Sequence, residues 1–218
     1  MASAAGLSGR AEDSLELLDR ALQGDPSANA HVRLWVLGVQ AEISSRLGRY
    51  REAERYYRQA MALDIEDVYL SGAFVDFLLD QGRPQEVLAL LKEDTLPDSL
   101  LVRVALAEQR LQSPDFARHM QSLRACFAAA RRRDDNRHLR EEARYTLHLL
   151  NQPGEALRLA RENWSSQREP ADARLVLESS LAASDFDSAR EVLSWLEQTR
   201  LEDVQLMTLR ERLERRQR

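Results

Sequence analysis

Apolar and small residues recur every three or four positions along most of the chain, with charged residues between them. Residues 50–61 show the pattern clearly, since Ala53, Tyr57 and Ala60 fall on one face of a helix and the positions between them are mostly polar. The same spacing returns in 139–150 and 202–217. A half-buried strand would instead alternate in steps of two, so the pattern predicts amphipathic helices throughout.

The stretch 34–67 is predicted to form two helices that meet at a bend at Gly48-Arg49. Its key positions return 34 residues later, so that matching residues are Gly48 and Gly82, Arg49 and Arg83, Glu52 and Glu86, Ala53 and Val87, and Tyr57 and Leu91. A fixed period of this length predicts stacked helical hairpins, because one hairpin cannot bury its apolar face alone.

This stretch resembles the tetratricopeptide repeat, in which a small residue of the second helix packs against an aromatic residue four positions later. Ala53 and Tyr57 occupy those positions, whereas Leu37 stands at the family's tryptophan and Ile65 at its closing proline. The resemblance implies an all-α fold, a right-handed α-α superhelix (solenoid) of helical hairpins. It also implies a non-enzymatic scaffold or adaptor that binds another protein.

Turn signals divide the chain further, among them Arg83-Pro84, Ser113-Pro114 and Asn151-Gln152-Pro153. We expect a partial repeat with a linker in 1–33, repeats in 34–67 and 68–97, degenerate helical hairpins in 98–135 and 136–168, a repeat in 170–200 and a C-terminal capping helix in 202–218. A capping helix would cover the last apolar face of the array.

Composition agrees with helices and argues against several classes of partner. Hydrophobic residues are 44% and charged residues 31% of the 218, with few glycines and prolines. The net charge of −5 gives no general attraction to nucleic acid or anionic membranes. No apolar run approaches the roughly 20 residues that span a bilayer. The start MASAAGLSG lacks a signal-peptide pattern, so we expect a cytoplasmic protein, or an exported one if a signal peptide has been removed.

No motif for catalysis is visible, neither a glycine-rich phosphate loop nor a paired-histidine zinc motif. His138 and His148 are ten positions apart, which does not place them on one helical face. The single cysteine, Cys126, is expected to be a buried thiol on a helix. We therefore predict no catalytic residue, no cofactor and no metal ligand.

The resemblance also implies a binding surface, because the first helix of each repeat lines a concave face in this family. By alignment, Glu42, Asp76, Glu108 and, less well aligned, Glu178 form one inward row. The other predicted partner-binding residues beside this row are Trp35 and Tyr69 and, one turn further on, Arg46 and Asp80. Carboxylates beside aromatic rings predict that the groove clamps a basic or helical segment of a partner protein. The alternative is that these residues are simply the solvent-facing positions of ordinary amphipathic helices.

Two further hypotheses stay open. An arginine cluster in the middle of the chain would bind RNA, DNA or another polyanion; it comprises Arg131, Arg132, Arg133, Arg137, Arg140 and Arg144. Against this, Asp134, Asp135, Glu141 and Glu142 lie among the arginines and can pair with them, which favours a solvated face. Alternatively, the first helix would self-associate to a homo-oligomer through Leu7, Leu15 and Leu22.

Overall fold

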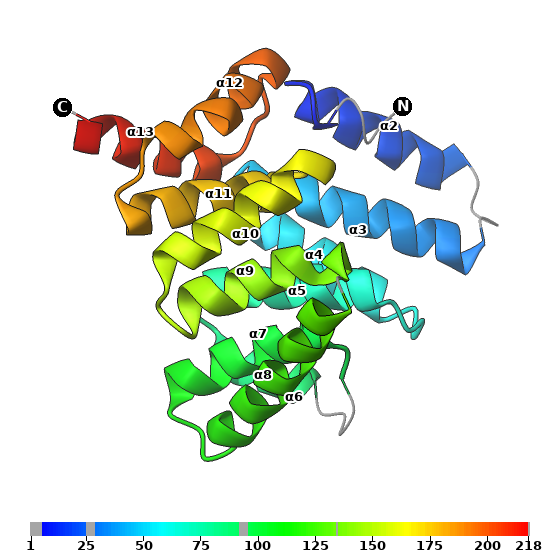
Figure 1. The fold of residues 1–218 in the computed structure, drawn as a ribbon. Coiled ribbons are helices and arrows are strands. Elements are labelled where there is room, and N and C mark those ends of the chain that lie inside the picture. Colours follow the sequence, from blue (N-terminus) through cyan, green and yellow to red (C-terminus); the bar gives the residue numbers. More distant parts are fainter. Residues whose placement is uncertain (1–5, 25–28, 92–95, 134, 218) are drawn as a thin grey trace. The chain divides into compact units, whose positions relative to one another are not determined.

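All regular secondary structure in the described part of the chain is helical, which confirms the predicted all-α repeat fold. The computed structural model describes residues 6–24, 29–91, 96–133 and 135–217. Figure 1 labels the α-helices α2 to α13. In chain order the helices are α2 (Ala11–Gly24), α3 (Ala30–Arg46), α4 (Tyr50–Met61), α5 (Val68–Asp80), α6 (Pro84–Leu90), α7 (Asp98–Leu111), α8 (Phe116–Arg132), η1 (Asn136–His138), α9 (Leu139–His148), α10 (Pro153–Ser166), α11 (Pro170–Ala183), η2 (Asp187–Ala189), α12 (Arg190–Thr199) and α13 (Val204–Gln217).

The two predicted glycine bends have the same backbone geometry. Gly48 has φ +75° and Gly82 has φ +70°, in the left-handed region that glycine enters without a steric penalty. The N–H of Arg49 donates to the carbonyl of Ser44 at 2.8 Å, and the N–H of Arg83 donates to that of Leu78 at 2.9 Å. Each pair spans five positions, as expected where a helix ends in a Schellman motif. Positions 34 residues apart in the sequence therefore have the same backbone geometry at these two bends.

Two later hairpins use the same bend without glycine. Gln112 has φ +52° and Ser184 has φ +55°. The following N–H groups, of Ser113 and Asp185, donate across five positions at 3.0 Å in each case. Gln112 follows Gly82 by 30 positions rather than 34, so the helix before it is shifted in register against the predicted alignment.

The helices belong to two compact units: unit 1 consists of residues 1–74 and 193–208, and unit 2 of residues 75–192 and 209–218. In unit 1, α2 packs on α3 through a core of Ala11, Leu15, Leu18, Val36 and Ile43. The ring of Tyr57 from α4 stacks on Phe74 from α5, with centroids 5.1 Å apart. These contacts bury the apolar stripes that the sequence pattern predicts.

The leucines considered for self-association are mostly covered inside unit 1. Leu15 is buried, and Leu22 packs against the same core, while Leu7 stays 37% exposed. The hypothesis of an open apolar face on α2 is therefore wrong for Leu15 and Leu22. The reason is that α3 begins at Ala30, before the predicted boundary, and supplies Val36 and Ile43 as partners.

The C-terminal segment of unit 1 lies against the start of α2 and the first bend. The N–H of Ala11 donates to Glu202 Oε2 at 2.8 Å. A Cβ atom on Gly9 would lie 2.8 Å from the carbonyl oxygen of Arg200, and one on Gly48 would lie 3.6 Å from Val204. Both glycines thus have φ above zero and a close neighbour from this segment.

Unit 2 contains the hairpins from α6 to α11. Phe127 of α8 and Tyr145 of α9 are fully buried, with ring centroids 5.1 Å apart. Ala143 and Ala156 have no exposed surface, and such small side chains let neighbouring helices approach closely. At the start of α11, the Glu169 and Asp172 side chains form a capping box. No helix within the described ranges is long and apolar enough to cross a bilayer.

Candidate protein-binding site

Six of the seven predicted binding residues lie on matching stripes of two first helices. Trp35, Glu42 and Arg46 are on α3, and Tyr69, Asp76 and Asp80 are on α5 at the positions that follow them by 34. Steps of seven and four residues place each set on one helical face. The first half of α5, with Tyr69, belongs to unit 1, and the second half, with Asp76 and Asp80, belongs to unit 2. Tyr69 therefore has its neighbours in unit 1, whereas Asp76 and Asp80 have theirs in unit 2.

In unit 1, the stripe carries large apolar side chains exposed to solvent. Trp35 is 54% exposed and Tyr69 is 63% exposed, and Val32 and Val68 beside them are also more than half exposed. The hydroxyl of Tyr69 donates to Glu42 Oε2 at 3.0 Å, which fixes the ring beside this carboxylate. We call the surface formed by these five residues the α3–α5 face.

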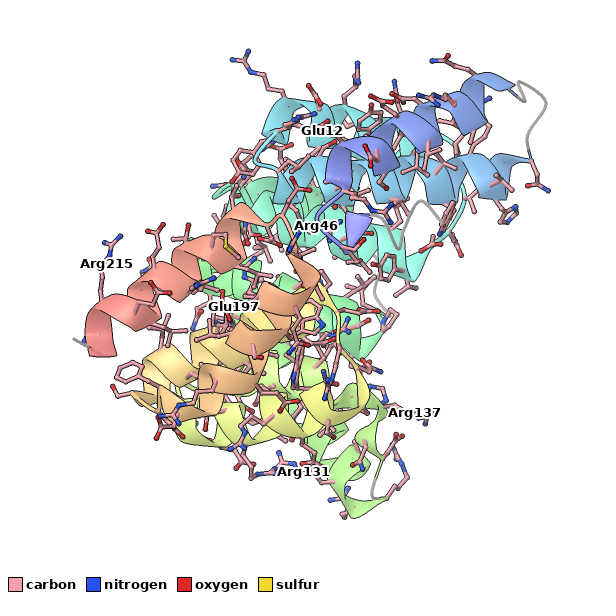
Figure 2. All side chains as sticks on the ribbon, turned by 90° about the horizontal axis from the view of Figure 1, so that it is seen from above. Glu12, Arg46, Arg131, Arg137, Glu197 and Arg215 are labelled. Carbon is pink, nitrogen blue, oxygen red and sulfur yellow. The ribbon has the colours of Figure 1, made fainter. Side chains whose placement is uncertain are left out.

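Charged groups surround the α3–α5 face. Asp64 and Glu66, just before α5, are exposed, and Asp67 accepts a hydrogen bond from the N–H of Leu70 at 2.8 Å. One turn beyond Glu42, the half-buried Arg46 has a buried Nε atom with no hydrogen-bond partner (labelled in Figure 2). Burial lowers the pKa of Arg46, opposed by the charges of Asp203 and Glu42.

In unit 2, the carboxylate of Asp76 is occupied by two arginines. Arg103 of α7 donates to it from Nε at 2.9 Å and from Nη2 at 2.7 Å, and Arg144 of α9 donates from Nη1 at 2.5 Å. Burial alone would raise the pKa of Asp76, but the two guanidinium charges and their hydrogen bonds lower it to about 2. Asp76 therefore links three first helices.

Asp80 and Glu178 are occupied in the same way. Arg174 of α11 donates to both oxygens of Asp80, at 2.7 and 2.8 Å, although the two residues are 94 positions apart. Arg174 also donates to Glu178 at 2.7 Å, and His148 Nε2 lies 3.2 Å from that carboxylate. Burial raises the pKa of Glu178, yet His148 and Arg174 together lower it to about 2. The predicted binding carboxylates Asp76, Asp80 and Glu178 are thus paired with basic side chains of the same chain.

Glu108 does not lie on an accessible face. Its side chain is 4% exposed, and its Oε2 lies 2.8 Å from Nδ1 of His119 on α8. The prediction for Glu108 is wrong because of the register shift before Gln112: counted from the bend, Glu108 matches the buried Leu78 and not Asp76. Arg103 is the α7 residue that bonds to Asp76. Counting back from the turn at Ser113-Pro114 would have corrected the alignment of α7.

The arginine cluster is divided among separate ion pairs. Arg140 donates to Asp172 and Glu169, Arg144 to Asp76, and Arg137 to Asp135. Arg131 Nε lies 2.8 Å from Glu142 Oε1; Arg131 and Arg137 are labelled in Figure 2. Asp134 lies outside the described residues. Most of these carboxylates come from other helices, so four of the six arginines are neutralised by neighbours and do not present a shared basic surface.

The remaining reactive side chains have structural partners. Cys126 is half-buried, and burial and the nearby Asp98 raise the pKa of its thiol, which disfavours the nucleophilic thiolate. His138 Nδ1 lies 2.7 Å from Asp98 Oδ2. Within the described residues, no three metal-ligating side chains gather at one point.

A cavity of about 560 Å³ in unit 2 lies between α10 and the segment 187–192. Its lining includes Val176 and Val192 together with several charged side chains. Some of these charged side chains pair with one another, as Arg190 does with Asp187 at 2.6 Å and Arg158 with Glu162 at 2.8 Å. None of the predicted binding residues lines it.

Comparison with known proteins locates the family resemblance at the start of the chain. The sequence model of the tetratricopeptide repeat family matches residues 1–66. No curated protein matches the chain. A crystal structure of PilW, described as a widely conserved type IV pilus biogenesis factor, matches 92% of this chain and 90% of its own, with 20% sequence identity and a TM-score of 0.44. A sequence identity and a TM-score this low do not allow a function to be assigned to this chain from PilW.

The family match spans α2, α3 and α4, including the Gly48 bend, and the Gly82 bend continues the same period. The resemblance predicted from the sequence is therefore confirmed, and residues 1–66 match the tetratricopeptide repeat family.

Proposed function

We propose that this protein is a non-enzymatic scaffold that binds a segment of another protein on the α3–α5 face. Tetratricopeptide repeats generally mediate protein–protein interaction, and the family match includes α3. The observation that carries the proposal is the exposure of Trp35 and Tyr69, which stand at matching positions of two successive first helices. Aromatic residues are the commonest energetic anchors of protein interfaces.

The size of the exposed surface supports this choice. Covering the exposed half of each ring would remove on the order of 100 Å² of apolar surface, which is worth about 2.5 kcal/mol per ring. Val32 and Val68, both more than half exposed, extend the same surface. A segment that buries all four side chains would offset much of the entropy lost on association.

The distribution of charge explains why the proposal does not extend to the whole predicted groove. Asp76 and Asp80 are bonded to arginines of the same chain, and Glu108 is buried. A partner would have to break these pairs before it could use them. The binding residues are therefore proposed to be Trp35, Tyr69 and Glu42, with Arg46 at the edge.

Affinity capture with matched variants tests the proposal. The test protein carries Trp35→Ala and Tyr69→Ala, and the control carries Leu17→Ala, which removes an exposed apolar side chain of α2 outside this face. Proteins captured from the source organism by the wild type should be lost with the double variant and kept with the control. Circular dichroism verifies that both variants fold. An identical set of captured proteins with the wild type and the double variant refutes the proposed face.

A further inference from the structure

We propose that the outer face of α8 (labelled in Figure 1) binds an acidic segment of a partner protein through its exposed arginines. We call the surface formed by Arg118, Ser122, Arg124, Ala125 and Arg132 the α8 face. It lies within unit 2, and none of its residues belongs to the α3–α5 face. The α8 face is therefore a second binding surface, and it does not depend on the proposed function.

The composition of α8 differs from that of the other α-helices. Its 17 residues include four arginines and no acidic residue, and Arg133 follows directly. Every other α-helix in the described ranges contains at least one Asp or Glu. Because the chain as a whole has a net charge of −5, this concentration of positive charge does not follow from the average composition.

The α8 face lies on the solvent side of the helix. The opposite side, which includes Leu123 and Phe127, is buried. Steps of seven residues place Arg118, Ala125 and Arg132 on one side, where all three are exposed. The two arginines are about 21 Å apart along the helix axis, with only short side chains such as Ala125 near the middle. A partner segment can therefore lie along the helix and meet an arginine at each end.

Three arginines of this region form no ion pair with any residue that the structure describes. They are Arg124, Arg132 and Arg133, and all three are exposed. Arg118 pairs only with Asp115, at 3.3 Å, and that carboxylate is 58% exposed. The helix dipole favours a cation in the last turn, which accounts for Arg132, but it gives no reason for Arg124 in the middle of α8. The positive charge of this face is thus available to a partner.

Other arginines of unit 2 show which ligand suits a guanidinium here. Arg103 donates to both oxygens of Asp76, and Arg174 donates to both oxygens of Asp80, in each case from another helix. A planar guanidinium matches a carboxylate in this two-bond geometry, and such bonds are stronger than those between neutral groups. We therefore expect Asp or Glu side chains of the partner at the arginines of the α8 face.

Two observations favour an acidic protein segment over nucleic acid. Proteins that bind single strands stack the bases on exposed aromatic rings, but Phe127 of α8 is buried and Phe116 is half-buried. Binding that depends on phosphates alone commonly uses roughly six to ten contacts, which is more than the arginines of α8 and Arg133 supply. A short acidic segment needs fewer contacts, because each carboxylate can form two hydrogen bonds with one guanidinium.

The test measures the binding of fluorescein-labelled dodecaglutamate to the full-length protein by fluorescence anisotropy. The salt concentration is about 0.1 M, at which charges more than about 10 Å apart are largely screened. The test variant carries Arg124→Gln, Arg132→Gln and Arg133→Gln. Because exposed ion pairs are individually weak, the loss of all three should raise the Kd about tenfold. Circular dichroism verifies that the variant folds.

The matched control removes the same amount of charge elsewhere. It carries Arg20→Gln, Arg190→Gln and Arg215→Gln, whose side chains are 72–75% exposed and pair with carboxylates of the same chain. Its Kd should stay within about twofold of that of the wild type, since these charges lie outside the α8 face.

Three results would overturn the proposal. The first is that dodecaglutamate shows no binding to the wild type. The second is that the test variant and the control weaken binding equally, which would mean that only net charge matters. The third is that a labelled single-stranded RNA of the same length binds more tightly than the peptide and is lost with the test variant, which would assign the α8 face to nucleic acid.

Discussion

The ion pairs of Asp76 can be tested by replacing this residue with asparagine. Asp76→Asn keeps the size of the side chain and removes the negative charge that Arg103 and Arg144 share. Their side chains are only 10% and 15% exposed, so water cannot fully replace the lost carboxylate. Arg103 keeps Glu141 at 3.6 Å and the carbonyl of Ser99 at 2.6 Å. The free energy of unfolding should therefore fall substantially, but by less than it would if the two arginines were left with no other partner.

The magnitude follows from the pKa of Asp76. Its lowering from 3.8 to about 2 is worth about 2.5 kcal/mol at 1.36 kcal/mol per unit. Because the folded pKa lies below the unfolded one, this contribution is fully present above about pH 4 and is lost as the pH falls through about 2. The variant should thus be about 2–3 kcal/mol less stable at pH 7, and the difference should shrink by about half at pH 3.

Urea unfolding followed by circular dichroism measures this difference at pH 7, 5 and 3. The matched control is Asp187→Asn, because Asp187 also pairs with an arginine, Arg190 at 2.6 Å, but its side chain is 78% exposed. A surface pair of this kind is worth less than about 1 kcal/mol. If Asp76→Asn costs no more than the control, or if its cost is the same at pH 3 and pH 7, the reasoning about the paired carboxylate is refuted.

Three further predictions concern other parts of the chain. Gly9→Ala should destabilise the protein by about 2–3 kcal/mol in thermal unfolding, because φ is +66° and the new Cβ would lie 2.8 Å from the Arg200 carbonyl; a neutral effect would contradict that contact. Phe127→Ala should cost about 3–5 kcal/mol in urea unfolding, since the ring is fully buried, and a cost below about 1 kcal/mol would place it outside the core. A double-mutant cycle on Asp80 and Arg174, both to alanine, should give a coupling energy of about 1 kcal/mol that decreases in 1 M salt; zero coupling would mean that the two residues do not pair in solution.

The sequence was sufficient where local spacing decides the structure. The period of the apolar positions predicted helices, and Gly48 and Gly82 predicted bends that the structure confirms. These features depend on residues close in the chain, so they can be derived without knowing the tertiary contacts. The exposed Trp35 and Tyr69 were also predicted on one face, because the 34-residue period relates them directly.

The pairing of the predicted carboxylates could not be derived in this way. Arg144 reaches Asp76 over 68 positions, and Arg174 reaches Asp80 over 94, which no helical spacing reveals. The error at Glu108 has another cause. The bend at Gln112 follows Gly82 by 30 positions, whereas Gly82 follows Gly48 by 34, so the residue that matches Asp76 is Leu106 and not Glu108. Residues of such a short repeat are aligned correctly by counting back from the bend that ends their helix, and not by applying a fixed period.

The composition of the two units has a consequence for how this chain acquires its structure on the ribosome. Glu202, which accepts the N–H of Ala11, follows it by 191 positions and is therefore synthesised much later than α2 and α3. At about 5–20 residues per second, α2 and α3 would wait on the order of 10 seconds or more for that segment. During this interval the N-terminal hairpins lack part of their covering, so nascent chains are expected to depend on chaperones more than an array that completes each repeat in turn.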